Sequence, residues 1–236
     1  MIEIWPVEGL PEIVHDDDLA AMLAEPLRSM GARDADVVAV TQKIVSKAEG
    51  RVVPDGGDGR SVWVTRETRR VVARRGDLII AETHHGFVCA NAGVDASNVE
   101  EGFVSLLPVD PDASAEALRA SLAQRLGLSR LGVVITDTFG RPWRNGLVNV
   151  AIGCAGLPAI IDLRGNADHH GRSLEVTVVA LADEVAAASG LVMGKSARVP
   201  VALIRGVDLT AGAPGRAVDL IRAPDEDLFR EGVIEP

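Results

Sequence analysis

One segment of this 236-residue chain combines the side chains that a site for metal and phosphate needs. It carries a carboxylate, a hydroxyl and two guanidinium groups: Asp137, Thr138, Arg141 and Arg144. Oxygens of Asp and Thr suit Mg²⁺ or Mn²⁺, and arginines neutralise phosphate or carboxylate oxygens. The apolar run at 133–135 predicts a buried strand stopped by Gly140, so Asp137 and Thr138 are expected at or just beyond its end. The alternative is a surface turn that Asp137 caps and in which the arginines are solvated.

A second predicted strand also leads into polar side chains. The apolar residues at 87–90 are followed by Gly93, Asp95, Ser97 and Asn98. Two carboxylates from distant strand ends can hold one divalent ion against nucleotide phosphates, so Asp95 and Asp137 are candidate partners. The residues equally allow Asp95 to serve only as a turn residue.

A third segment places lysines on a short predicted helix. Residues 37–40 indicate a buried strand, and the helix after it ends at Gly50. Lys43 and Lys47 then lie one turn apart on one face, where they could meet phosphate or simply be solvated. Neither a Walker loop nor a dinucleotide-binding glycine motif occurs in the sequence.

Four motifs give the chain a resemblance to a known family. They are LPEI at 10–13, VTQKIVSK at 40–47, AGVDASN at 92–98 and ITDTFGRPWRNG at 135–146. By these motifs the chain resembles the coenzyme F420-0:gamma-glutamyl ligase family, and the resemblance runs through almost its whole length. The last two motifs are long and specific.

The resemblance implies a reaction, its cofactors and a fold. The reaction is the GTP-dependent attachment of L-glutamate to coenzyme F420-0, a deazaflavin phospholactate, through an acyl phosphate. The cofactor is Mn²⁺ or Mg²⁺, with K⁺ as a further candidate. The fold is a homodimeric α+β (mixed α/β) arrangement of mixed sheets with packed helices. We expect one catalytic unit over residues 1–236, with room for two lobes and without a C-terminal flavin-reductase-like domain.

The resemblance also implies roles for particular residues. Metal ligands are expected at Asp95, Asp137 and Thr138, and catalytic roles at Asp95, Asp137 and Lys47. Nucleotide contacts are expected at Leu10, Pro11, Glu12, Ile13, Gln42, Lys47 and Asn98. Some relatives carry Ser in place of Gln42, so the contact made by its longer amide stays open. Candidates for contact with substrate or phosphate are Arg141, Arg144, Asp168 and Glu175. For Asp168 and Glu175 three roles remain open: part of a lid over the substrate, additional metal ligands, or a structural turn.

Two other classes of function use the same residues. A metal-dependent nucleotide phosphohydrolase would direct water with these carboxylates, and a non-catalytic GTP-binding dimer would bind without turnover. Net charge of −10 argues against nucleic-acid binding. Cys89 and Cys154 lack a C-x-x-C partner, which favours buried free thiols and a cytoplasmic protein, and no apolar run is long enough to span a membrane. The histidine pairs at 84–85 and 169–170 do not indicate zinc.

The remaining pattern predicts the elements that hold these segments. Helices are expected after Asp18 with a kink or restart at Pro26, over 66–75 with a basic face, over 114–126 and over 177–189. A late strand is expected at 199–204. The small-residue stretch at 148–161 could fill the core or form a dimer interface.

Overall fold

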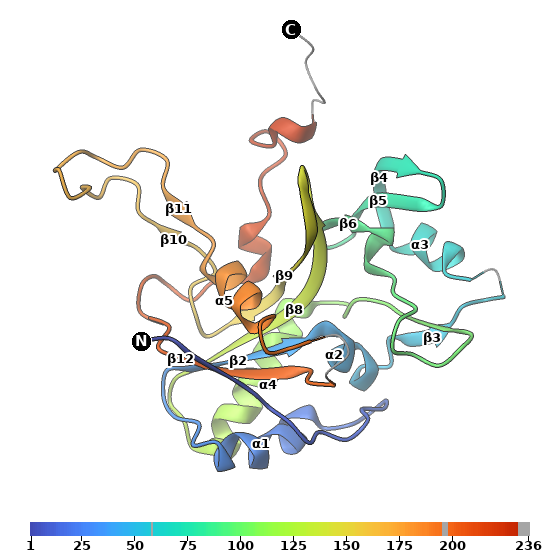
Figure 1. The fold of residues 1–236 in the computed structure, drawn as a ribbon, viewed down its shortest axis with the longest axis horizontal. Helices are drawn as coiled ribbons and strands as arrows, with labels where there is room; N and C mark the ends of the chain where they lie inside the picture. Colours follow the sequence, from blue (N-terminus) through green and yellow to red (C-terminus); the bar gives the residue numbers. More distant parts are fainter. Residues whose placement is uncertain (58, 195–197, 231–236) are drawn as a thin grey trace, which may run out of the picture.

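A mixed sheet forms the centre of the protein in the computed structural model, which describes residues 1–57, 59–194 and 198–230 (Figure 1). Its five strands are, in spatial order, β1 (Glu3–Pro6), β12 (Val201–Arg205), β2 (Asp36–Thr41), β8 (Leu131–Arg141) and β9 (Arg144–Ala155). The neighbours β2 and β8 are parallel, and every other pair is antiparallel. The α+β class expected from the sequence is confirmed.

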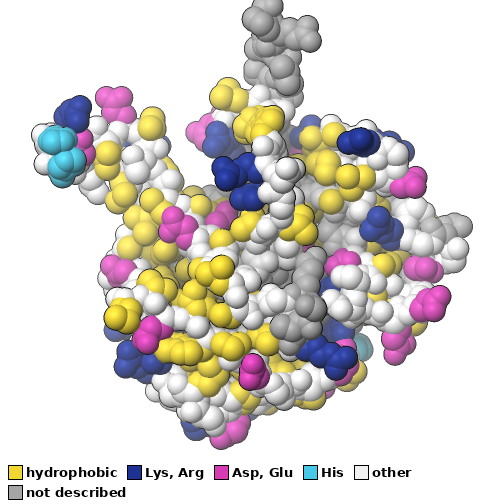
Figure 2. Space-filling model, viewed as in Figure 1, with side chains coloured by type: hydrophobic (Ala, Val, Ile, Leu, Met, Phe, Trp, Pro, Cys, Tyr) yellow, Lys and Arg dark blue, Asp and Glu magenta, His cyan; other side chains and the backbone are white. Residues whose placement is uncertain are grey.

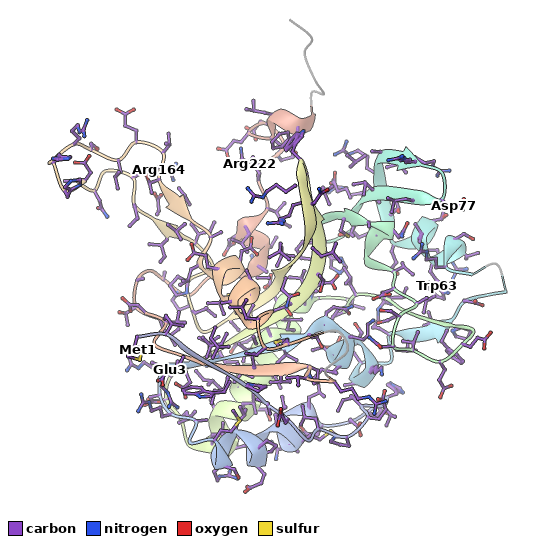
Figure 3. The ribbon with its side chains drawn as sticks, in the orientation of Figure 1. Met1, Glu3, Trp63, Asp77, Arg164 and Arg222 are labelled. Carbon is purple, nitrogen blue, oxygen red and sulfur yellow. The ribbon has the colours of Figure 1, made fainter. Side chains whose placement is uncertain are left out.

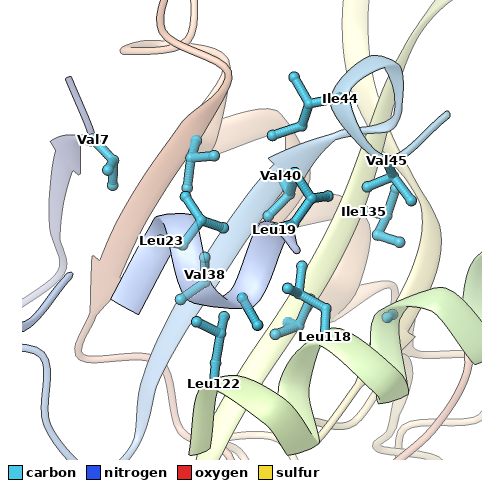
Figure 4. Packing of buried hydrophobic residues seen from close by; sticks show 14 of the residues in the cluster. Val7, Leu19, Leu23, Val38, Val40, Ile44, Val45, Leu118, Leu122 and Ile135 are labelled. Atoms are coloured by element: carbon cyan, nitrogen blue, oxygen red, sulfur yellow. The ribbon is translucent and has the colours of Figure 1, made fainter. Parts of the chain in front are cut away.

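Helices cover both faces of this sheet. The helices are α1 (Leu19–Ser29), α2 (Gln42–Ala48), α3 (Ser61–Glu67), α4 (Pro111–Leu126) and α5 (Leu181–Ser189), with 3₁₀ turns η1 (Asn91–Gly93), η2 (Ala217–Leu220) and η3 (Leu228–Arg230). Because successive strand residues point to opposite faces, Val38 and Val40 pack with α1 and α4 (Figure 4). Val37 and Ala39 point to the other face and pack with α5. Burial on both faces explains the unbroken apolar run of β2.

Capping residues explain where the two longest helices begin and end. Asp18 accepts a hydrogen bond from the backbone N–H of Ala21 at the start of α1, and Asp110 accepts one from Ala113 at the start of α4. Gly127, at φ 69°, ends α4 in the left-handed conformation that glycine adopts without strain. The helix expected over 114–126 is confirmed, and α1 is continuous through Pro26.

Three smaller sheets surround the central one. They are β3 (Val52–Pro54) with β7 (Phe103–Ser105); β4 (Thr68–Arg75), β5 (Leu78–Thr83) and β6 (Val88–Ala90) in that order; and β10 (Ile161–Asp162) with β11 (Val178–Val179). Trp63 of α3 donates a hydrogen bond of 2.7 Å to the carbonyl of Pro54, which ties α3 to β3 (Figure 3). A separate small core of Val64, Val94, Val104 and Leu106 lies in this region.

Asp137 and Thr138 lie within a strand, so the expectation that β8 ends near them was wrong. The strand continues to Arg141 because β9 pairs with it from Val133 to Arg141, with Asp137 opposite Val150 and Thr138 opposite Asn149. The register shifts between Ile135 and Thr136, directly before Asp137. A bulge of this kind redirects the side chains that follow it.

The arginine-rich stretch at 66–75 is mostly a strand, and the helix expected there was wrong. The helix α3 stops at Glu67, and β4 runs from Thr68 and pairs with β5 across a turn at Gly76 and Asp77. β-Branched residues on both sides of a Gly-Asp pair favour a hairpin, and that signal outweighs the helical spacing of the arginines.

A long arm separates β9 from α5. Its strands β10 and β11 pair near the body, and hydrogen bonds such as Gly165 N–H to Leu174 C=O continue outward (Figures 1 and 2). Residues 178–179 belong to the returning strand, so α5 begins at Leu181 and not at 177 as expected.

Several further expectations from the sequence are decided by burial. Residues 151–155, 157 and 159 are buried within one copy of the chain, so the middle of the small-residue stretch fills the core. Both cysteines are free and buried, as predicted. The late strand is confirmed at β12. Within the part of the chain that the structure describes, no helix is long and apolar enough to cross a membrane.

Candidate functional site

One cavity of about 460 Å³ collects every residue expected to contact metal or nucleotide. These residues are Leu10, Pro11, Glu12, Ile13, Gln42, Lys47, Asp95, Asn98, Asp137 and Thr138. Gln42 and Lys47 lie near Asp137 and Thr138 because β2 and β8 are parallel neighbours, with Thr41 beside Thr136, so the residues that follow these two positions lie at the same end of the strand pair. Ligand sites in sheets with parallel strands commonly lie at that end.

Asp95 enters the cavity from a short bridge at the edge of the β3–β7 sheet. Asp95 and Ser105 exchange both backbone hydrogen bonds, at 3.0 and 2.8 Å. The carboxylate accepts hydrogen bonds from the backbone N–H and the hydroxyl of Ser97, at 2.7 and 2.8 Å. The Asx turn left open from the sequence is therefore present, and it orients a carboxylate that also lines the cavity.

Lys43 gives Asp95 its cationic partner. The Lys43 ammonium donates to Asp95 Oδ2 at 2.8 Å and to Ser97 Oγ at 2.9 Å, although Lys43 and Asp95 are far apart in sequence. Burial raises the pKa of Asp95, but the hydrogen bonds and charge of Lys43 and the hydrogen bonds of Ser97 outweigh it and hold that pKa below its usual value. Asp95 is therefore anionic throughout the neutral range.

Lys47 lies one turn further along α2 and faces the same cavity. Its ammonium makes an ion pair with Glu12, whose side chain is 77% exposed while that of Lys47 is only 15% exposed. An ion pair with so exposed a carboxylate contributes little to stability, so Glu12 can be exchanged for another anion at low cost. The placement is consistent with the expected role of Lys47 beside a nucleotide.

The third metal candidate is fixed by a neighbour across the sheet. Thr138 donates its hydroxyl proton to Asn149 Oδ1 at 2.9 Å, and its backbone N–H donates to Asp137 Oδ1 at 2.8 Å. Asn149 also lines the cavity. Because the hydroxyl proton is used by Asn149, the oxygen lone pairs of Thr138 remain available to bind a cation.

Gln42 contacts the cavity from a buried position. It is 2% exposed, and its side-chain oxygen accepts a hydrogen bond of 2.8 Å from the hydroxyl of Ser46. The amide oxygen of Gln42 therefore already has one hydrogen-bond partner within α2.

The donor set fits a divalent cation that keeps part of its coordination for other ligands. Asp95 and Asp137 offer two carboxylates and Thr138 offers a hydroxyl in one cavity. Among the described residues, no group of three or more His, Cys, Asp and Glu side chains could hold a metal by itself. Mg²⁺ is typically bound by one or two carboxylates together with substrate phosphates and water, which this set allows.

Other lining residues carried little or no signal in the sequence. They include Thr136, Asn149, Met193 and the segment 198–200. Gly194 and Lys195 stand out in sequence as a potential phosphate contact, and the fold brings Gly194 to the cavity; Lys195 lies outside the described residues. Only pairing with distant strands brings this late segment beside β2, so local pattern could not predict it.

Four candidate residues lie away from the cavity. Arg141 and Arg144 are exposed at the end of the β8–β9 hairpin, and Arg141 donates to the carbonyl of Asn145 there. Asp168 and Glu175 lie on the arm, where Asp168 accepts hydrogen bonds from the backbone N–H groups of His170 and Arg172. Within one copy of the chain, none of the four lines the cavity.

The histidine pairs take no part in the cavity. A ring nitrogen of His84 contacts the carbonyl of Arg66 at 2.9 Å, and one of His85 contacts the carbonyl of Pro108 at 2.9 Å. His169 and His170 are exposed in the turn of the arm that the Gly171 N–H closes on the Asp168 carbonyl. Figure 2 shows histidine side chains on the projecting arm, away from the body.

A second cavity of about 500 Å³ adjoins the first. The two share Glu12, Ile13, Lys47 and Asn98. Apolar side chains dominate its remaining wall: Val14, Val52, Val99 and Phe103. The two cavities together can accept a charged group and a larger, less polar group side by side.

Known proteins of one family are similar to this chain along almost its whole length. The model of the F420-0:Gamma-glutamyl ligase family matches residues 9–55 and 59–206. Proteins named coenzyme F420:L-glutamate ligase from Methanothermobacter thermautotrophicus, Methanopyrus kandleri and Archaeoglobus fulgidus are 40%, 41% and 39% identical to this chain. Each alignment covers 97% of this chain, and 99%, 98% and 96% of those three proteins, respectively. The chain belongs to the F420-0:gamma-glutamyl ligase family.

Proposed function

We propose that this protein is an amide-forming ligase that attaches L-glutamate to coenzyme F420-0 with GTP as the energy source. Family membership and the names of the relatives support the ligase reaction. The observation that carries the finer proposal is the single cavity, into which distant segments bring two carboxylates, a hydroxyl and two lysines.

The reaction needs activation of a carboxylate. A carboxylate is a poor electrophile, so an oxygen of the substrate carboxylate attacks the γ-phosphorus of GTP, GDP departs, and an acyl phosphate forms. The amine of glutamate then attacks the acyl carbon, phosphate departs, and the amide forms with loss of one amine proton. Both steps require positioning and charge neutralisation, and neither requires a covalent bond to the protein.

The residues of the cavity divide these tasks. Asp95, Asp137 and Thr138 would hold Mg²⁺ or Mn²⁺, which when bound supplies positive charge to the transferring phosphoryl group. Lys47 would exchange the exposed Glu12 carboxylate for a nucleotide phosphate. The segment 10–13, with Gln42 and Asn98, would contact the rest of the nucleotide. The adjoining apolar cavity leaves room for the bulk of one of the two large substrates.

Mass spectrometry of the complete reaction tests the proposal. The protein is incubated with GTP, MnCl₂, L-glutamate and the deazaflavin phospholactate, and we expect the acceptor to gain glutamyl units, with one GDP and one phosphate released for each. Asp137→Asn serves as the inactive comparison.

Two control reactions separate the ligase from its rivals. GTP consumption that continues unchanged without glutamate and acceptor, with no amide formed, would identify a phosphohydrolase. GTP binding without turnover on this acceptor would instead support a non-catalytic GTP-binding protein.

A further inference from the structure

The Lys43 ammonium is held inside the cavity by three contacts. Its side chain is 16% exposed, and its ammonium contacts Asp95 Oδ2, Ser97 Oγ and the carbonyl of Ser97. An ammonium has three N–H donors, so all of them are used. Lys43 is therefore a fixed charge in this arrangement, unlike a solvated lysine on a helix face.

The Asp95 carboxylate is nearly saturated by the same contacts. Oδ2 accepts hydrogen bonds from Lys43 and from the Ser97 hydroxyl, and Oδ1 accepts one from the Ser97 backbone N–H. A carboxylate offers about four acceptor positions, two on each oxygen. A cation can therefore approach Oδ2 only after Lys43 or the Ser97 hydroxyl leaves, and at Oδ1 it would lie close to the ammonium.

Electrostatic repulsion disfavours binding of a divalent ion at Asp95 while the Lys43 ammonium is there. A divalent ion beside Asp95 would meet the Lys43 charge at a few ångströms in a partly buried setting, where solvent screens repulsion poorly. We propose that Lys43 is an internal counter-ion that holds the place of the divalent cation at Asp95, so that metal binding must displace it. An anionic phosphate that receives the released ammonium then strengthens metal binding, and by thermodynamic reciprocity the metal strengthens nucleotide binding to the same extent.

This inference rests on the proposed divalent-metal site but makes a different claim. At a simple metal site, removing a nearby lysine would only relieve repulsion through space, so Mn²⁺ binding would strengthen slightly and to a similar extent for Lys43 and Lys47. At a site that Lys43 occupies, removing Lys43 would strengthen Mn²⁺ binding much more than removing Lys47. The cavity offers a matched comparison in Lys47, which has the same charge on the same helix face but is paired with Glu12 and not with Asp95.

The inference is tested by measuring Mn²⁺ binding, which needs no turnover. Bound Mn²⁺ is measured as the loss of the electron paramagnetic resonance signal of the free ion. Wild type, Lys43→Met, Lys43→Arg and Lys47→Met are compared with and without a non-hydrolysable GTP analogue, after circular dichroism has shown that each variant is folded. Methionine keeps most of the aliphatic stem, and arginine keeps the charge.

We expect Lys43→Met to bind Mn²⁺ at least about tenfold more tightly than wild type when nucleotide is absent. The analogue should tighten Mn²⁺ binding in wild type, because its phosphates receive the ammonium that Mn²⁺ displaces. It should tighten binding much less in Lys43→Met, which has no ammonium to displace. Lys43→Arg and Lys47→Met should stay within about threefold of wild type without nucleotide.

The outcomes separate this inference from the proposed function. If wild type binds Mn²⁺ and Lys43→Met binds it equally or more weakly, the place-holder role is overturned while the metal site stands. If Lys43→Arg gains as much affinity as Lys43→Met, displacement of charge is the wrong explanation. If no form of the protein binds Mn²⁺ with or without the analogue, the metal site itself fails, and this inference fails with it.

Discussion

Thr138 and Asn149 face each other across β8 and β9, and the Thr138 hydroxyl donates a hydrogen bond of 2.9 Å to Asn149 Oδ1. The bond uses the hydroxyl proton and leaves the oxygen lone pairs of Thr138, which lines the cavity, available to a cation. Asn149 therefore orients a proposed metal ligand without being one itself.

Asn149→Ala is expected to weaken Mn²⁺ binding by about tenfold, because side chains that orient metal ligands usually contribute that much. Calorimetric titration with Mn²⁺ measures the effect. Asn145→Ala is the matched control, since Asn145 lies on the same strand but is exposed and does not line the cavity. Equal affinities for the two variants would show that Asn149 has no orienting role.

Asp137→Asn is expected to keep the fold and to lose about a hundredfold or more of the ligase activity. The amide oxygen can still accept the hydrogen bond that the Thr138 N–H gives to Asp137 Oδ1, but the negative charge is gone. Initial rates at saturating Mn²⁺ measure the loss. Asp208→Asn, in an exposed turn, should be fully active. Near-normal turnover by Asp137→Asn would remove this carboxylate from the site.

Arg205→Leu is expected to lower the free energy of unfolding by about 3–5 kcal/mol, because a buried carboxylate loses its counter-ion. Arg205 donates to both oxygens of Asp36, at 2.8 and 2.7 Å, and the Asp36 side chain is only 1% exposed. Urea denaturation measures the change. Arg164→Leu breaks an exposed pair with Asp162 on the arm (Figure 3) and should change the free energy of unfolding far less. Similar losses for both variants would contradict the assignment.

Neither cysteine of the folded protein should react with iodoacetamide at pH 8. Burial raises the pKa of both thiols to about 12, with the charge of Asp137 adding to the effect at Cys89 and those of Asp112 and Asp219 at Cys154. The thiolate is the reactive form, and it appears only as the pH approaches that raised pKa. Mass spectrometry should show no label in buffer and two labels in urea. Rapid labelling of the native protein would show that the thiols are accessible.

We expect the protein to be a homodimer, as the family resemblance implies. The hairpin end exposes Trp143 and Leu147, at 78% and 61%, and the arm exposes Val176 at 86%. Apolar side chains this exposed on projecting elements favour burial against a second copy, and a permanent dimer buries on the order of 2,000 Å² or more. Light scattering should give twice 24.8 kDa at micromolar and lower concentrations. A mass near 24.8 kDa throughout would rule the dimer out.

The sequence by itself determined the parts whose causes are local. The apolar run of β2, the helix that follows it to Gly50, and the capped helix α4 could all be predicted, because burial pattern and capping act within a few residues. The motifs also indicated the residues of the cavity, since long specific motifs identify a family without any geometry.

The tertiary structure alone decided the partners that come from far along the chain. Whether 66–75 is helix or strand depended on β5, the length of β8 depended on β9, and the arm delayed the start of α5. The two lysines of α2 look alike in sequence, yet one pairs with Asp95 and the other with Glu12. Backbone hydrogen bonds and ion pairs are satisfied by whichever groups the fold brings within about 3 Å, and local sequence does not specify those groups.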